Sequence, residues 1–189
     1  MISAILLAAG TSSRFEGKNK LLSQYKNKVL FKYAYEELVK SKINEIVVVL
    51  GKNRNEFKKL ISKNQKVKVL YNKNYKKGIS TSIKEGLKKI KKPTKGFLIC
   101  LSDMPKIKAN VHNKIIKKFS LNKNYPVVPT YNKKRGNPVC FPYNFKRKLM
   151  KLKGDVGAKN ILKKSKFISI NVKSKSILID FDKRSDFKN

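Results

Sequence analysis

The chain has 189 residues, 40% of them hydrophobic, and we predict a single domain over residues 1–189, because this length supports one sizeable core but not two. It contains 47 Lys and Arg against 11 Asp and Glu, which gives a net charge of +36. The lysines are spread over nearly every predicted helix and loop, and this distribution favours a general lysine bias over a specific nucleic-acid partner. Two cysteines and one histidine exclude zinc sites of the Cys₄ and Cys₂His₂ types.

The N-terminal segment is apolar from Ile2 to Ala9 and has no basic residue ahead of it. It is too short to span a bilayer and continues into a glycine- and serine-containing loop, so we predict a buried first strand over Ser3–Ala8. No other segment approaches 18 apolar residues. We therefore expect a cytoplasmic protein with no membrane partner.

Strand-length apolar runs alternate with segments of helical spacing. The predicted strands are Ser3–Ala8, Glu45–Leu50, Lys66–Tyr71, Gly96–Leu101, Tyr125–Pro129, Pro138–Phe141, Phe167–Val172 and Ile177–Ile179. The predicted helices are Leu30–Lys42, Asn55–Lys63, Ser80–Lys91 and Asn110–Phe119. This alternation predicts an α/β fold with a mainly parallel sheet covered on both faces, and the closer strands after residue 120 predict a mixed sheet there.

The cysteines and the histidine give little sign of chemistry. Cys100 and Cys140 each lie in an apolar run, as buried free thiols do. His112 lies in a polar helical stretch, so we expect it at the surface and do not expect a Ser-His-Asp triad.

Three loops that follow predicted strands carry phosphate or metal chemistry. They are Ala9–Arg14 after the first strand, Asn72–Ser82 after the third and Ser102–Pro105 after the fourth. Ligands of open α/β sheets bind beyond the carboxyl ends of the strands, so we expect these three loops to meet at one edge.

The first loop, Leu7–Lys20, has the composition of a phosphate cradle. Gly10 allows a sharp turn and a close approach to a ligand, and the small residues around it expose backbone N–H groups. Arg14 offers a planar fork for phosphate oxygens, and Lys20 offers a mobile point charge. The loop is neither a Walker P-loop nor a G-x-G-x-x-G motif, and its composition alone favours an ordinary polar loop over a phosphate site.

The motif Leu-Ala-Ala-Gly-x-Ser-x-Arg-Phe, followed by Lys20-Leu21, resembles the signature loop of the nucleotidyltransferases related to molybdenum cofactor cytidylyltransferase. The resemblance implies a single-domain, three-layer, Rossmann-like nucleotidyltransferase fold in which this loop wraps a triphosphate. Arg14 and Lys20 would then neutralise the phosphates, and Ala9 would favour CTP over GTP. The nucleotide-binding residues it implies here are Leu7, Ala8, Ala9, Gly10, Thr11, Ser12, Ser13, Arg14 and Lys20.

The second loop, Gly78-Ile79-Ser80-Thr81-Ser82, is similar to the family's Gly-x-Ser-x-Ser motif. Ser80 has the character of an N-cap, and a helix that begins there would direct its free N–H groups toward the nucleotide. The resemblance assigns Gly78, Ser80 and Ser82 to nucleotide binding. Helix capping alone explains the two serines equally well.

The third loop places Asp103 at the end of a buried strand, where the resemblance implies a ligand of Mg²⁺. Mg²⁺ needs only one or two carboxylates besides phosphates and waters. Asp103 lies too early to cap the next predicted helix. The family motif is Gly-Asp-Gln-Pro, and Ser102 and Met104 depart from it.

Three later segments complete the resemblance. Gly136, Asn137 and Pro138 match a family motif on the acceptor side of the cleft, and Asp155 matches another, although it is equally a cap for the helix that follows it. Asp182 matches an acidic position that can supply a second Mg²⁺ ligand, and an exposed acidic turn is its competing explanation.

The resemblance implies transfer of CMP from CTP to a molybdopterin-type phosphate, with release of pyrophosphate. Arg14, Lys20 and Asp103 would be catalytic, Mg²⁺ the cofactor, CTP or another nucleoside triphosphate a substrate, and a molybdenum hydroxylase a further partner. The alternatives are a sugar or alcohol phosphate acceptor, a non-enzymatic cofactor chaperone and a nucleic-acid binder suggested by charge. No G-x-G-x-x-G motif supports a nicotinamide-dependent oxidoreductase.

Overall fold

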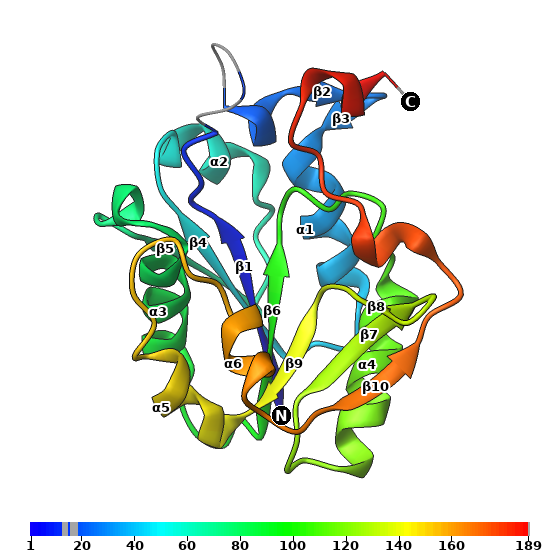
Figure 1. Cartoon of the computed structure of the whole chain (residues 1–189). Coiled ribbons are helices and arrows are strands. Elements are labelled where there is room, and N and C mark those ends of the chain that lie inside the picture. The colour runs from blue at the N-terminus through cyan, green and yellow to red at the C-terminus, as the bar shows by residue number, and fades with distance from the viewer. Residues whose placement is uncertain (13–14, 16–18, 189) are drawn as a thin grey trace.

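The computed structural model describes residues 1–12, 15 and 19–188, and within them one eight-stranded sheet forms the centre of the molecule (Figure 1). Its strands are β1 (Ile2–Ala8), β4 (Glu45–Leu50), β5 (Val67–Tyr71), β6 (Gly96–Leu101), β7 (Val127–Tyr131), β8 (Lys134–Arg135), β9 (Val139–Pro142) and β10 (Ile168–Asn171). They run in the order β10-β7-β9-β6-β1-β4-β5, with β8 paired to β7. A separate short hairpin joins β2 (Gln24–Tyr25) and β3 (Lys28–Val29).

The sheet is mixed and mainly parallel, as predicted. β1 pairs in parallel with β4 and β6, and β5 in parallel with β4. The carboxyl ends of these four strands therefore share one edge. β9 is antiparallel to both β6 and β7, while β10 runs parallel to β7.

Helices cover both faces of the sheet, which makes three layers. They are α1 (Leu30–Lys40), α2 (Arg54–Leu60), α3 (Ile79–Lys89), α4 (Ala109–Leu121), α5 (Lys146–Leu149) and α6 (Lys159–Lys163). One face packs against α1, α2 and α4, and the other against α3, α5 and α6. Alternation along β1 explains this division, because Ala4 and Leu6 point to one layer while Ile5 and Leu7 point to the other.

Two expectations about the fold were wrong. Ile177–Ile179 is not a strand, because most of it lies in a 3₁₀ helix over Lys175–Leu178 that the Ser174 hydroxyl caps by accepting from the Ser176 N–H. His112 is not at the surface, since it lies on the inner face of α4 with only 3% of the residue exposed. Val111, the preceding residue, is also buried, so His112 lies at the border of the apolar face that packs against the core.

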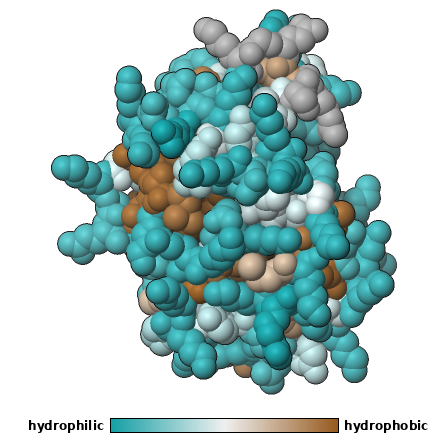
Figure 2. All heavy atoms as spheres, turned by 90° about the vertical axis from the view of Figure 1, so that its left-hand side faces the viewer, coloured by the Kyte–Doolittle hydropathy of each residue, from teal (hydrophilic) through white to brown (hydrophobic). Residues whose placement is uncertain are grey.

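The side of the molecule that carries β5 and α3 is largely hydrophilic, with its most extensive apolar area on the left of the view in Figure 2. At the edge strand β5, Ile61, Val67 and Val69 line a shallow hollow. Among the described residues, no helix is both long and apolar enough to cross a membrane.

Candidate nucleotide and metal site

A cleft of about 870 Å³ opens at the carboxyl edge of β1, β5 and β6. The three loops that follow these strands meet there, as predicted, together with the C-terminal segment and the loop before α6. Its lining residues include Leu7, Ala9, Gly10, Thr11, Ser12, Lys20, Gly78, Ser82, Asp103, Asp155 and Asp182. The volume lies in the range of small-molecule sites.

Ser12, whose backbone is left-handed with φ 53°, connects the two described ends of the first loop. Its hydroxyl donates to Asn19 Oδ1 at 3.1 Å and accepts from the Lys20 N–H at 3.1 Å. This fixes Lys20 at the start of a short 3₁₀ helix, Lys20–Leu22. A Cβ built on Gly10 meets nothing within 4 Å, so the glycine turn leaves open space for a ligand. The predicted Ser13 and Arg14 lie outside the described residues.

Backbone contacts bring two acidic segments together beside this loop. Ser102 ties the start of the Asp103 loop to β1, because its hydroxyl donates to the Leu7 carbonyl at 2.8 Å. The Phe181 N–H then donates to the Asp103 carbonyl at 2.9 Å. Asp182, the next residue, is thereby placed next to Asp103.

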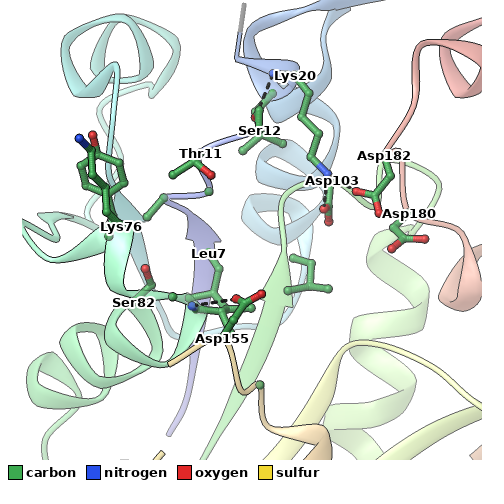
Figure 3. A pocket seen from close by; sticks show the side chains of 18 of the residues that line it. Leu7, Thr11, Ser12, Lys20, Lys76, Ser82, Asp103, Asp155, Asp180 and Asp182 are labelled. Carbon is green, nitrogen blue, oxygen red and sulfur yellow. Dashed lines mark hydrogen bonds and ion pairs between the residues drawn. The ribbon is translucent and has the colours of Figure 1, made fainter. Parts of the chain in front are cut away.

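The ammonium of Lys20 lies between these two carboxylates (Figure 3). Lys20 Nζ donates to Asp103 Oδ2 at 2.8 Å and to Asp182 Oδ1 at 2.6 Å. Burial lowers the pKa of Lys20, but the charge of Asp103 and the hydrogen bonds to both carboxylates outweigh it, so the pKa is raised above its usual 10.5. Lys20 is therefore fully charged at physiological pH.

The acids of this cleft fit a metal site that a substrate completes. Asp103 Oδ1 is buried and has no hydrogen-bond partner, so it is free to bind a cation. Within the described part of the chain, no cluster of three or more His, Cys, Asp or Glu could hold a metal alone. Two carboxylates suit Mg²⁺ or Mn²⁺ when phosphate oxygens complete the shell.

Nearly all the aspartate of the chain is collected here. Of its five aspartates, Asp103, Asp155, Asp180 and Asp182 line the cleft. The protein as a whole has a net charge of +36, so this cleft is a place where negative charge is concentrated in an otherwise strongly basic molecule.

The second loop differs from prediction at the start of α3. Gly78, with φ 99°, occupies the N-cap position, and Ser80 is the second helical residue with a buried, unpartnered hydroxyl. Ser80 is therefore not the N-cap, because the chain turns two residues earlier. Ser82 lines the cleft, and the buried Asn72 holds it by donating from Nδ2 to Ser82 Oγ at 2.9 Å.

Asp155 lies at the start of α3 and does not cap the helix that follows it. Its Oδ1 accepts from the Ile79 N–H at 3.3 Å, while α6 has no side-chain cap. Gly136, Asn137 and Pro138 do not line the cleft. Gly136 and Asn137 lie against the 3₁₀ helix at Ile177, whose carbonyl accepts from the Asn137 N–H at 3.0 Å, and Pro138 lines a small cavity with Leu38 and Met104.

Sequence reasoning missed several residues of the cleft. Tyr75, Lys76 and Lys77 form a short 3₁₀ helix on its far side from Asp103, and Asp180 lies beside Asp182 (Figure 3). Gly51, behind the cleft lining, was also missed: a Cβ there would lie 2.7 Å from the carbonyl oxygen of Ala9 and 2.9 Å from the ring of Tyr75, both of which line the cleft. A glycine directly after a buried strand was the available signal.

A family model matches most of the chain, from residue 4 to residue 169, and its description is MobA-like NTP transferase domain. The chain belongs to this family. The match covers the first two loops and the Asp103 loop, and these three loops line the cleft. The C-terminal segment with Asp182 lies outside the match.

Three proteins are similar to the chain over nearly its whole length. The chain is 22% identical over 186 residues to the molybdenum cofactor cytidylyltransferase of Escherichia coli (strain K12), covering 98% of the chain and 93% of the relative. The crystal structure of Rv0371c from Mycobacterium tuberculosis H37Rv matches with a TM-score of 0.84 and 20% identity, over 99% of the chain and 95% of that structure. A 4-diphosphocytidyl-2C-methyl-D-erythritol synthase from Anaerococcus prevotii DSM 20548 matches with a TM-score of 0.78 and 18% identity, over 98% and 92%.

Proposed function

We propose that the protein transfers CMP from CTP to a molybdopterin-type phosphate and releases pyrophosphate. The observation that carries this proposal is the meeting of Lys20, Asp103 and Asp182 beside the open turn at Gly10. The similarity to the E. coli molybdenum cofactor cytidylyltransferase supports the choice of donor and acceptor.

The reaction needs little covalent help from the protein. An oxygen of the acceptor phosphate attacks the α-phosphorus of CTP, a new P–O bond forms, and the bond from the α-phosphorus to the bridging oxygen of pyrophosphate breaks. The protein contributes position and charge stabilisation. Lys20, Arg14 and the amides of the first loop would balance charge on the departing pyrophosphate.

Asp103 and Asp182 would hold Mg²⁺, the proposed cofactor. The ion would neutralise negative charge on the phosphate oxygens. A second structure of Rv0371c is a manganese complex and matches this chain with a TM-score of 0.74. That match supports a divalent metal in the fold.

An alcohol phosphate acceptor is a second candidate. The 4-diphosphocytidyl-2C-methyl-D-erythritol synthase of Anaerococcus prevotii has the same fold. Gly136, Asn137 and Pro138, proposed to face the acceptor, lie outside the cleft lining, so they do not decide between the two acceptors.

The test is a pyrophosphate-release assay with each of the four nucleoside triphosphates and Mg²⁺. Each is run with molybdopterin, with an alcohol phosphate and without acceptor, and EDTA serves as the metal control. We expect release only with CTP, molybdopterin and metal together. Release with the alcohol phosphate alone would move the assignment to that acceptor. Absence of release in every arm would favour a cofactor chaperone and overturn the proposal.

A further inference from the structure

Lys20 is bound to the same carboxylates that the proposed function gives to the metal. Its ammonium contacts one oxygen of Asp103 and one oxygen of Asp182, at 2.8 and 2.6 Å. The Lys20 side chain is only 14% exposed, against 22% for Asp103 and 40% for Asp182. The pair of carboxylates therefore already has a cation of its own.

A divalent cation would bind the same two carboxylates that Lys20 now engages, either at the unpartnered Asp103 Oδ1, close to the ammonium, or at the oxygens that the ammonium contacts. Taken by themselves, Lys20 and these two partly buried carboxylates carry one net negative charge, and the addition of a dication would reverse that sign. A bare metal ion must therefore either displace Lys20 or bind against its charge. Either course weakens binding of the metal alone.

Lys20 can leave the carboxylates without unfolding the loop. Its backbone N–H is fixed by Ser12 Oγ, and the following 3₁₀ helix begins at the same residue. Its four-carbon stem is flexible, so the ammonium can turn toward another anion in the cleft while the main chain stays in place. Gly10 and Thr11 line the same cleft and border the space where a triphosphate would lie.

We propose that Lys20 competes with the metal for Asp103 and Asp182, and that a triphosphate removes this competition by giving the ammonium another anionic partner. This inference rests on the proposed nucleotide and metal site. It makes binding of the metal and the nucleotide mutually favourable, because each relieves a charge conflict that the other meets when it binds alone. Linkage requires the effect to be equal in both directions.

The experiment measures Mn²⁺ binding to the full chain by electron paramagnetic resonance, in phosphate-free buffer without nucleotide. The variants are Lys20→Met, Lys20→Arg and Lys76→Met. Lys76 lines the far side of the cleft, so Lys76→Met removes the same charge without touching the carboxylates. Circular dichroism and thermal melting verify that each variant is folded.

We expect Lys20→Met to bind Mn²⁺ about tenfold more tightly than the wild type, within the usual range of coupling between sites. Lys76→Met and Lys20→Arg should remain close to the wild type. Equal or weaker binding by a folded Lys20→Met would overturn the inference. Tighter binding by Lys76→Met of the same size would overturn it as well, since the effect would then be general electrostatics.

A second arm adds the α,β-methylene analogue of CTP, which resists transfer. We expect the analogue to strengthen Mn²⁺ binding to the wild type at least about fivefold, and to have a clearly smaller effect on Lys20→Met. An equal effect on both proteins would overturn the inference and leave the proposed function standing. If neither protein binds Mn²⁺ in either arm, the proposed metal site fails, and the inference with it.

Discussion

The carboxylate of Asp186 fixes the backbone at Asp182. Its Oδ2 accepts hydrogen bonds from the N–H groups of Asp182 and Lys183, both at 2.8 Å. These hydrogen bonds lower the pKa of Asp186, and the bond from the Lys183 N–H has the larger effect. A surface aspartate thus sets the turn that presents a proposed metal ligand.

Replacing Asp186 by alanine should weaken metal binding. The turn loses both hydrogen bonds, Asp182 is no longer held toward Asp103, and we expect Mn²⁺ affinity to fall about tenfold, as for other residues that orient metal ligands. Asp186→Asn keeps an oxygen acceptor and should lose less. Unchanged Mn²⁺ affinity in Asp186→Ala would show that the turn holds its shape without this carboxylate.

Asn72 should control how Ser82 meets the nucleotide. Asn72 donates from Nδ2 to the hydroxyls of Thr81 and Ser82, at 2.8 and 2.9 Å, which leaves the Ser82 proton for a ligand in the cleft. Asn72→Asp reverses this bond, because a carboxylate only accepts, and the Ser82 hydroxyl would then donate to it. We expect the nucleotide KM to rise about tenfold, equivalent to one lost hydrogen bond to a charged group.

A double variant separates this effect from general damage to the site. Ser82→Ala should raise the KM by a similar factor, and Ser82→Ala combined with Asn72→Asp should be no worse than either alone. Additive losses would mean that Asn72 acts on the nucleotide by another route. Steady-state pyrophosphate release is the measurement for all three proteins.

Two glycines with positive φ offer a matched test of backbone packing. A Cβ on Gly78, φ 99°, would lie 2.4 Å from the carbonyl carbon and oxygen of Gly154, whereas a Cβ on Gly154, φ 59°, meets nothing within 4 Å. Gly154→Ala strains the backbone by about 1 kcal/mol, and Gly78→Ala by about 1–3 kcal/mol, because φ 99° with ψ 168° is a conformation that is nearly confined to glycine. Only Gly78→Ala adds a steric clash, which costs about 1–3 kcal/mol more.

Urea unfolding measures this difference directly. Gly78→Ala should lower the free energy of unfolding clearly more than Gly154→Ala, and it should also loosen the contact between α3 and the loop that carries Asp155. If the two variants lose the same stability, the loop before α6 yields to the added methyl group and the close approach at Gly78 is not a constraint.

The order of strands and helices was predictable because it depends on local hydrophobic periodicity. Glu45–Leu50 and Gly96–Leu101 are continuous apolar runs, and both are buried strands with the predicted bounds. The meeting of the three loops followed from the same pattern, since the carboxyl ends of parallel strands share an edge.

The pairing of Lys20 with Asp182 was not predictable in this way. It depends on one long-range backbone bond, from the Phe181 N–H to the Asp103 carbonyl, and on rings that pack the C-terminal turn against the β2–β3 hairpin. The Tyr25 and Phe181 rings lie 4.8 Å apart, and the Phe181 and Phe187 rings 5.4 Å apart. Contacts between segments so distant in the sequence leave no periodic signal.

His112 was misplaced because a polar residue lies next to the apolar stripe of its helix. Val111, Ile115 and Phe119 form that stripe, and one residue's difference in phase decides whether position 112 faces water or the core. Burial lowers the pKa of His112 to about 4 from its usual 6.5. This shift gives the fold a measurable sensitivity to acid.

The sign of this sensitivity follows from proton linkage. Between pH 6.5 and pH 4 the unfolded chain binds a proton at His112 that the folded chain does not bind, so acidification favours unfolding. The contribution to stability is complete above pH 6.5 and is lost as the pH falls toward about 4, by on the order of 3 kcal/mol. A hydrogen bond with the backbone of Lys108 and, to a smaller extent, the charge of Glu37 oppose the lowering of the pKa but do not cancel it.

His112→Leu should remove this part of the acid sensitivity. We expect the difference in unfolding free energy between wild type and variant to move in favour of the variant as the pH is lowered from 7 to 4.5, measured by urea unfolding at each pH. Carboxylates such as Asp186 and Glu36, whose pKa values are lowered in the fold, contribute equally to both proteins and cancel in the comparison. A difference that stays constant over this range would show that His112 titrates normally in the folded chain and that its burial is incomplete in solution.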